Sequence, residues 1–241
     1  MMLSYDEQFA DCYDLFYLGV GKDYADEVER LLELLDDHDV PRSGRLLDAA
    51  CGTGLHLQYL REHFDVEGFD LSPAMLDRAL KRLPDVPLHR GDLVCCELGR
   101  RFDVVCCLFG SIGYVLTTQR LRACIANLAS HLAPGGVLVV EPWLTPESFK
   151  PGRPGGMLVE EEGLKLARMT ATRRQGRVSI LELHFLLNDG AEVRYFVNRH
   201  ELGLFSREEM EAAFTAAGLR VEFDEAGLDG RGLYLGFMET D

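Results

Sequence analysis

Apolar residues recur with helical spacing over the first forty residues of the chain. The two stripes consist of Tyr5, Phe9, Tyr13, Phe16 and Tyr17, and then of Val28, Leu31, Leu32, Leu34 and Leu35. Spacings of three and four residues place side chains on one face of a helix. Pro41, Ser43 and Gly44 then break the pattern. The pattern predicts two helices.

From residue 45 to about residue 143, short apolar runs alternate with amphipathic stretches. The apolar runs are Leu46–Ala50, Val66–Phe69, Val86–His89, Phe102–Leu108 and Val137–Glu141. Ser72 and Pro73 supply an N-cap and a first-turn proline for one helix. Thr117 or Thr118 can cap another helix, which runs to His131. Continuous apolar strands that alternate with helices predict a mostly parallel sheet covered on both faces, which is a Rossmann-like α/β fold.

The rhythm changes to period two after Pro151. Apolar residues share one face of the run 178–187, and the alternation resumes at 193–197 beyond the turn at Asn188-Asp189-Gly190. This pattern predicts an inserted antiparallel sheet. Ser206 and Glu209 then form a capping box for a helix that ends at Gly218.

Two last strands are predicted at Arg220–Phe223 and Leu233–Met238. The chain is therefore expected to form a single domain over residues 1–241. Its predicted parts are an N-terminal helical cap (1–40), a core (41–150), the inserted sheet (151–205) and a C-terminal helix with strands (206–241).

Charge and cysteine content narrow the possible partners. The formal net charge is −15, from 40 acidic and 25 basic residues, so nucleic acid is not an expected partner. No run reaches the roughly 20 apolar residues of a membrane helix, and the acidic N-terminus does not resemble a signal peptide. The seven cysteines include no C-x-x-C pair. We therefore expect buried free thiols, no metal site, no membrane partner and a cytoplasmic location.

The sharpest motif follows the first predicted strand. The strand ends at Asp48, and the chain then turns through Gly52 and Gly54 into a helix. Glycines at such a turn let the backbone approach a ligand closely. The third small residue of a dinucleotide-binding turn is replaced by Leu57, which argues against NAD, and no P-loop is present.

Two more carboxylates follow the next strands. Asp70 ends the second strand, where an acidic side chain can bind both hydroxyls of a ribose; the alternative is an N-cap for the helix at Ser72. Asp92, within Arg90-Gly91-Asp92-Leu93, can accept the amino proton of an adenine; the alternative is a plain turn. Leu71, Met75 and Leu93 could sandwich the ring.

Two further segments complete the order, a strand that opens onto Gly110 and the turn Pro134-Gly135-Gly136 before another strand. At these residues the chain resembles the class I methyltransferases. The resemblance implies a seven-stranded sheet with one antiparallel strand, and S-adenosylmethionine across the ends of the first two strands. It assigns cofactor binding to Ala49, Cys51, Gly52, Gly54, Asp70, Leu71, Asp92, Leu93 and Leu108, beside Met75. Many relatives carry glycine where this chain has Ala50.

A closer resemblance is to the nucleotide-amino-sugar N,N-dimethyltransferases. It is carried by Tyr13–Tyr17, Gly21–Ala25, Ser111–Tyr114, Val140–Trp143, Ala213–Gly218 and Gly230–Leu233. Those enzymes dimethylate the amine of a TDP-linked deoxyamino sugar in macrolide biosynthesis. The resemblance implies the inserted antiparallel sheet and, commonly, a homodimer.

On this hypothesis, Tyr17 and Tyr114 line the methyl-transfer site, because tyrosine faces attract a sulfonium cation. Glu141, Trp143 and Arg231 bound the sugar nucleotide, and Arg231 meets the diphosphate. A core role for Tyr17 stays open. His56 is either a cofactor contact or a surface residue.

Two other functions stay open at this point. One is a methyltransferase for another small acceptor, such as an amino acid, a phenol or a quinone-like ring, because the fold does not choose the nucleophile. The other is a non-catalytic S-adenosylmethionine binder.

Overall fold

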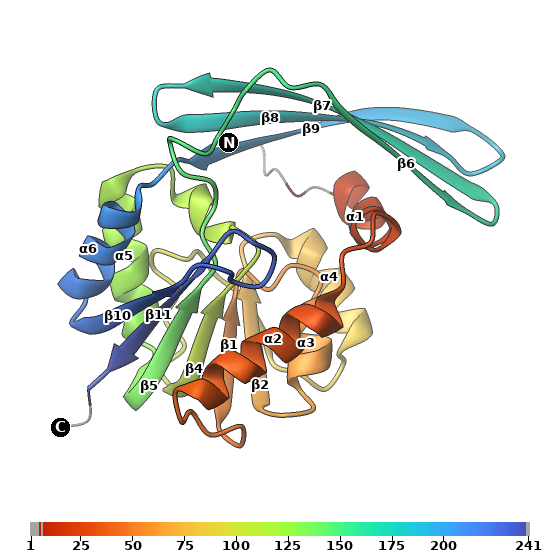
Figure 1. Cartoon of the computed structure of the whole chain (residues 1–241). Coiled ribbons are helices and arrows are strands. Elements are labelled where there is room, and N and C mark those ends of the chain that lie inside the picture. The colour runs from red at the N-terminus through yellow and green to blue at the C-terminus, as the bar shows by residue number, and fades with distance from the viewer. Residues whose placement is uncertain (1–4, 6, 240–241) are drawn as a thin grey trace.

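The computed structural model describes residues 5 and 7–239, and these residues form two sheets (Figure 1). The central sheet has seven strands in the order β10-β11-β5-β4-β1-β2-β3, and the roof sheet has four in the order β6-β7-β8-β9. The strands of the central sheet are β1 (Arg45–Ala49), β2 (Asp65–Asp70), β3 (Leu88–Arg90), β4 (Phe102–Cys107), β5 (Leu132–Val140), β10 (Leu219–Asp224) and β11 (Leu233–Met238). Those of the roof sheet are β6 (Gly155–Glu161), β7 (Leu164–Gln175), β8 (Val178–Asn188) and β9 (Val193–Gly203).

The central sheet is parallel except at β11, which runs antiparallel to both β5 and β10. This confirms the predicted α/β sheet with one antiparallel strand. The helices are α1 (Glu7–Gly19), α2 (Tyr24–Asp37), α3 (Leu55–Leu60), α4 (Pro73–Arg82), the 3-10 turn η1 (Ser111–Val115), α5 (Thr118–Ala129) and α6 (Arg207–Ala216).

Helices cover both faces of the central sheet. Residues of α5 and α6 pack on one face, and residues of α2 and α3 pack on the other. Cys106 and Cys107, adjacent on β4, point to opposite faces and join different clusters, because successive strand residues alternate in direction. The apolar runs that form β1, β2, β4 and β5 are therefore strands buried on two sides, whereas the run at 86–89 yields only the short edge strand β3, which is not buried.

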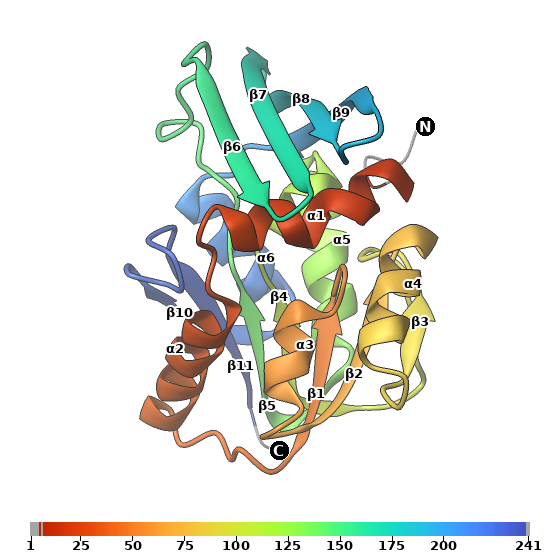
Figure 2. The same cartoon turned by 90° about the vertical axis from the view of Figure 1, so that its right-hand side faces the viewer.

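The roof sheet lies over α1 (Figure 2), and its strand β9 also contacts the core directly, where His200 is hydrogen-bonded to Tyr114 of η1. Alternate residues of its inner face pack on Phe9 and Phe16 of α1; they include Val159, Leu166, Leu183, Phe185 and Leu187. The predicted hairpin is confirmed, with Asn188 paired to Val193 at its end. Strands β6 and β7, which the pattern did not locate, complete the sheet.

Local capping signals gave accurate helix starts. The Ser72 hydroxyl accepts from the Met75 N–H at 3.3 Å, and Thr117, rather than Thr118, caps α5. Both hydrogen bonds of the capping box between Ser206 and Glu209 are present. The expected turn at 134–136 is found as an irregularity within β5, which already begins at Leu132: the register against β4 shifts there, and Gly135 has a φ of 77°.

The six cysteines from Cys51 to Cys124 are free thiols. Five of these six and Cys12 are buried as expected, but Cys95 is exposed because it lies in the turn after β3. Within the described residues, no helix is long and apolar enough to cross a membrane.

Candidate functional site

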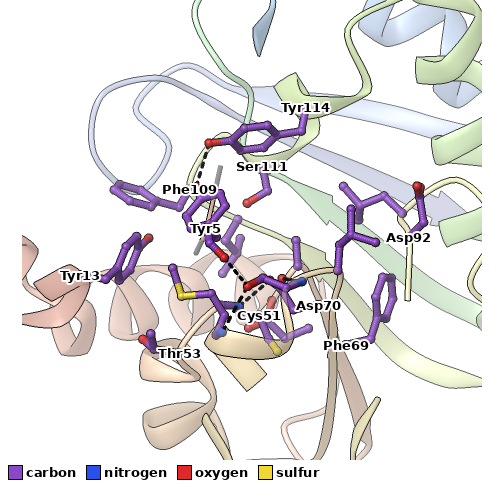
Figure 3. A pocket seen from close by; sticks show the side chains of 18 of the residues that line it. Tyr5, Tyr13, Cys51, Thr53, Phe69, Asp70, Asp92, Phe109, Ser111 and Tyr114 are labelled. Carbon is purple, nitrogen blue, oxygen red and sulfur yellow. Dashed lines mark hydrogen bonds between the residues drawn. The ribbon is translucent and has the colours of Figure 1, made fainter. Parts of the chain in front are cut away.

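A cavity of about 500 Å³ lies between the carboxyl ends of the central strands and the roof sheet (Figure 3). Eight of the ten residues predicted to bind the cofactor line it. They are Cys51, Gly52, Asp70, Leu71, Met75, Asp92, Leu93 and Leu108. Ala49 is fully buried within β1 instead, and Gly54 lies behind the turn, where an added Cβ would come within 3.1 Å of Leu83. Binding by these residues stays a prediction.

Asp70 joins the turn after β1 to the turn after β2. Its Oδ2 accepts from the Gly52 N–H at 2.9 Å, and its Oδ1 accepts from the Ser72 N–H at 2.8 Å. Ser72, not Asp70, is the N-cap of α4, so the capping alternative is wrong. Because each carboxylate oxygen accepts more than one hydrogen bond, Asp70 can brace both turns and still accept from a ribose.

Asp48 lies beside Asp70 and is a site residue that the sequence analysis missed. It is 2% exposed at the end of β1 and lines the cavity. Burial, together with the neighbouring Asp70, raises the pKa of Asp48 to about 8. Burial also raises the pKa of Asp70, against the lowering effect of its backbone donors. Two buried carboxyls at one end favour a cationic ligand. The signal available in the sequence was Asp48 itself, an acidic residue near the end of an apolar strand.

The backbone of the first turn is left-handed at three positions. The φ angle is 63° at Ala50, 57° at Gly52 and 78° at Gly54. Glycine adopts this conformation without strain, whereas a residue with a Cβ does so at a cost. This explains why the related motif carries glycine where this chain has Ala50.

Asp92 follows β3 and also lines the cavity. Its Oδ1 accepts from the Val94 N–H at 2.9 Å, and its Oδ2 lies 3.5 Å from Arg120. The apolar side chains of Leu71, Met75 and Leu93 line the same cavity. This arrangement can hold a flat ring between apolar walls with an acceptor at its edge.

Aromatic residues form the side of the cavity under the roof sheet. Tyr114 lines it, and its hydroxyl lies 2.8 Å from the Tyr5 hydroxyl and 2.7 Å from His200 Nδ1. Tyr17 is outside the wall and packs against two lining residues, at ring distances of 4.7 Å from Tyr13 and 5.0 Å from Phe109. Burial raises the pKa of Tyr17 and Tyr114, so both phenols stay protonated at neutral pH.

The three residues predicted for the sugar nucleotide form a cluster outside the cavity wall. Arg231 pairs with Glu141 at 2.8 Å and with Asp229 at 2.7 Å, and its guanidinium lies 5.2 Å from the Phe109 ring. Burial raises the pKa of Glu141 to about 7, against the lowering effect of Arg231. Trp143 donates from its Nε1 to the Ser179 hydroxyl of the roof sheet at 2.9 Å. Their role in substrate binding stays a prediction.

His56 is not a surface residue, because it is 7% exposed and lines the cavity. Its Nε2 lies 2.8 Å from Glu27, which also pairs with Lys22. Burial lowers the pKa of His56, against the effect of Glu27, so the ring is neutral beside an ion pair. The glycine motif before α3 did not indicate that His56 would pair with Glu27, which lies on α2.

Asn198 and His200 are further polar residues missed by the sequence analysis. Both lie on the inner face of β9, and both are buried. Asn198 Oδ1 and His200 Nε2 have no hydrogen-bond partner among the described residues. Asn198 and His200 share one face of β9 with Phe196 and Leu202, and two polar residues at this spacing between apolar ones were the signal available in the sequence.

Comparison with known proteins assigns the family. The model of the methyltransferase domain family matches residues 18–222. The chain is 48% identical, over 96% of its length and 98% of the relative's, to the dTDP-3-amino-3,4,6-trideoxy-alpha-D-glucopyranose N,N-dimethyltransferase of Streptomyces venezuelae.

Two solved structures are also similar. One is DesVI from Streptomyces venezuelae, with 47% identity, a TM-score of 0.92, and coverage of 97% of this chain and 100% of that one. The other is CalS10 with bound S-adenosylmethionine, an amino pentose methyltransferase from Micromonospora echinaspora. It has 44% identity, a TM-score of 0.85, and coverage of 93% and 95%. The chain therefore belongs to the methyltransferase domain family and is an S-adenosylmethionine-dependent methyltransferase.

Proposed function

We propose that this methyltransferase N-methylates, and N,N-dimethylates, the amine of a TDP-linked deoxyamino sugar. The observation that carries the proposal is the cavity itself. It joins an acidic end, at Asp48 and Asp70, to an uncharged aromatic end at Tyr5 and Tyr114. The first suits a cationic methyl donor and the second suits a neutral amine. The relative with 48% identity bears the name of this reaction.

The residues of the cavity fit S-adenosylmethionine. Asp70 binds the ribose hydroxyls, Asp92 accepts from the adenine amino group, and Asp48 faces the methionine ammonium. When bound, the donor supplies a methyl group whose S–C bond breaks, with its electron pair kept on sulfur, as the amine lone pair forms the N–C bond. The ammonium product then releases its proton to water.

The chain contributes position rather than acid–base chemistry. In-line displacement gains most of its rate from holding the reacting atoms in register. Because Tyr17 and Tyr114 have raised pKa values, neither is a phenolate base at neutral pH. Tyr114 faces the amine, and Tyr17 packs behind the cavity wall against Tyr13, whose ring contacts Tyr5 beside Tyr114. The roof sheet and the aromatic side chains of the cavity wall exclude water from the reacting atoms during the transfer.

Arg231 is the proposed partner of the diphosphate. Its side chain is 15% exposed, and it already pairs with Asp229 and Glu141. A phosphate would therefore replace Asp229 in this pair, while Glu141 keeps the guanidinium oriented. Trp143 anchors the neighbouring loop to the roof sheet through Ser179.

The proposal is tested by incubating the enzyme with S-adenosylmethionine and a panel of TDP-amino-deoxysugars, with products read by mass spectrometry. A product heavier by two methyl groups is expected and identifies the sugar. No product from any sugar, with the cofactor still bound in calorimetry, would contradict it and direct the search to other acceptors.

We further propose that the chain forms a homodimer through the outer face of the roof sheet. One cross-strand row there is apolar across all its strands: Leu158, Ala167, Leu186 and Tyr195. Leu158 is 60% exposed and Tyr195 is 61% exposed. A self-complementary apolar face suits a twofold interface. Light scattering should give twice the chain mass, and Leu186→Glu should give the monomer; a monomeric parent chain would contradict this.

The proposed location is the cytoplasm. The six free thiols from Cys51 to Cys124, five of them buried, suit a reducing compartment. Cell fractionation with an antibody checks this, and recovery in a secreted fraction would contradict it.

A further inference from the structure

A short chain of hydrogen bonds crosses the aromatic end of the cavity. The Tyr5 hydroxyl lies 2.8 Å from the Tyr114 hydroxyl, which lies 2.7 Å from His200 Nδ1. Figure 3 shows the Tyr5 and Tyr114 rings meeting over Asp70. The three residues come from the segment before α1, from η1 and from β9. They are therefore brought together only by the packing of the roof over the core.

This chain of hydrogen bonds determines whether the Tyr114 hydroxyl can donate a hydrogen bond into the cavity or accept one from it. A hydroxyl carries one hydrogen and two lone pairs. Consecutive hydrogen bonds polarise one another, which favours a hydroxyl that donates to one neighbour and accepts from the other. Whether the hydrogen points to Tyr5 or to His200, it is then used within the chain. The direction left open toward the cavity is a lone pair, which can only accept.

A histidine at position 200 is unfavourable for the stability of the fold. It is 4% exposed and lies 5.3 Å, between ring centroids, from both Tyr5 and Phe9. Its Nε2 has no partner among the described residues. An apolar side chain, such as Leu202 on the same face, would avoid this unsatisfied nitrogen. The bond to Tyr114 is what His200 adds.

His200 does not act as a proton store. Burial, with the charge of Arg168 nearby, lowers its pKa to about 4. The imidazole is therefore neutral under physiological conditions, and a proton passed along the chain would find no stable site there. Orientation of Tyr114 is the role that remains.

We propose that Tyr5 and His200 are positioning residues that hold the Tyr114 hydroxyl as a hydrogen-bond acceptor for the N–H of the substrate amine. This rests on the proposed function. An amine that donates to Tyr114 has its lone pair turned away from that oxygen and toward the donor methyl. A primary amine offers two N–H groups and a secondary amine one, whereas a neutral tertiary amine offers none. The same contact thus selects for two transfers and ends the reaction there.

The experiment compares His200→Leu with His200→Asn in the full-length enzyme. The amide of His200→Asn can reach Tyr114 from the same branch of the side chain as Nδ1, whereas leucine cannot. For His200→Leu we expect kcat to fall at least tenfold, with the KM for the sugar changed by less than threefold. Monomethylated product should accumulate, because the secondary amine has a single N–H to orient. His200→Asn should restore a large part of both values.

Cofactor affinity measured by calorimetry should be unchanged in both variants, which separates positioning from a damaged fold. If His200→Leu does not fold, Tyr5→Phe provides the test at a half-buried position, with the same expected accumulation of monomethylated product. If the parent enzyme is active and His200→Leu, or Tyr5→Phe where that variant is used, has the same kcat and product ratio as the parent, this inference alone is overturned. A parent enzyme inactive on every amino sugar would overturn it together with the proposed function.

Discussion

Asp48 and Asp70 end adjacent parallel strands, and their carboxyls face the same cavity. Asp48 is paired in register with Gly68 of β2, two residues before Asp70. This proximity, added to burial, places the pKa of Asp48 near 8. The acidic end of the cavity is therefore partly protonated at neutral pH until a cation binds.

Cofactor binding should accordingly depend on pH. Below about pH 8 the empty protein holds a proton on Asp48, and only the carboxylate attracts an ammonium group. Binding must then release that proton, so affinity should fall as the pH falls from 8 to 6, by at most about tenfold per unit. Calorimetry in two buffers of different ionisation enthalpy measures the release. Asp48→Asn should bind more weakly without this dependence; equal affinity of the parent enzyme at pH 6 and pH 8 would contradict the prediction.

Asp70→Ala should weaken S-adenosylmethionine binding by about 1–3 kcal/mol, the cost of losing hydrogen bonds to a charged group. It also removes the acceptor of the Gly52 and Ser72 N–H groups, so some of the loss comes from the turns. Asp70→Asn, which keeps one oxygen, is the matched variant and should lose less. Unchanged affinity of Asp70→Ala in titration calorimetry would remove Asp70 from the cofactor site.

Ala50→Gly should leave the protein equally stable or stabilise it by up to about 1 kcal/mol, because the strain of a Cβ at positive φ outweighs the added freedom of the unfolded chain. Ala49→Gly is the control. Ala49 is fully buried in β1 with ordinary strand geometry, so glycine there should destabilise by roughly 1 kcal/mol. Urea unfolding of both variants decides the matter, and equal losses would refute the role of the φ angle.

Asn198→Ala should raise the KM for the sugar about five- to 150-fold while kcat stays within threefold, corresponding to about 1–3 kcal/mol for one buried hydrogen bond. The Oδ1 atom is buried in the roof of the cavity, has no hydrogen-bond partner within residues 5 and 7–239, and can accept from a substrate hydroxyl or amine. Exposed Asn188→Ala, at the hairpin end, is a control on the same sheet. Steady-state kinetics with a saturating cofactor test this, and a fall in kcat alone would assign Asn198 to orientation instead.

Much of the fold could be read from the sequence because its signals are local. A run such as Phe102–Cys107 can be buried on both sides only in the middle of a covered sheet, and Ser72 caps a helix that begins at its neighbour. The turn through Gly52 and Gly54 is likewise a property of consecutive residues. Such features do not depend on what the rest of the chain does.

The boundaries of the strands in the roof sheet and the partners of the charged residues were harder to predict from the sequence. Strand β7 mixes apolar and charged residues on both faces: Leu166 is buried with Arg168 next to it on the same face, and Met169 is exposed on the other, so its sequence carries little pattern without β6 and β8 beside it. Arg231 presents itself in the sequence as a free cation, but the structure pairs it with two carboxylates, one of them 90 residues away. Residue type alone does not reveal such neutralisation.

The sequence by itself determined the fold class, the first turn, and the acidic residues at the strand ends, since these follow from local propensity and periodic burial. Only the tertiary structure decided that Tyr5, Tyr114 and His200 form one hydrogen-bonded chain, because the contacts join residues 109 and 86 positions apart. It likewise decided that Tyr17 lies behind the cavity wall and His56 within it. Contacts of this kind depend on how the roof sheet packs over α1 and the core, and no short stretch of sequence encodes that packing.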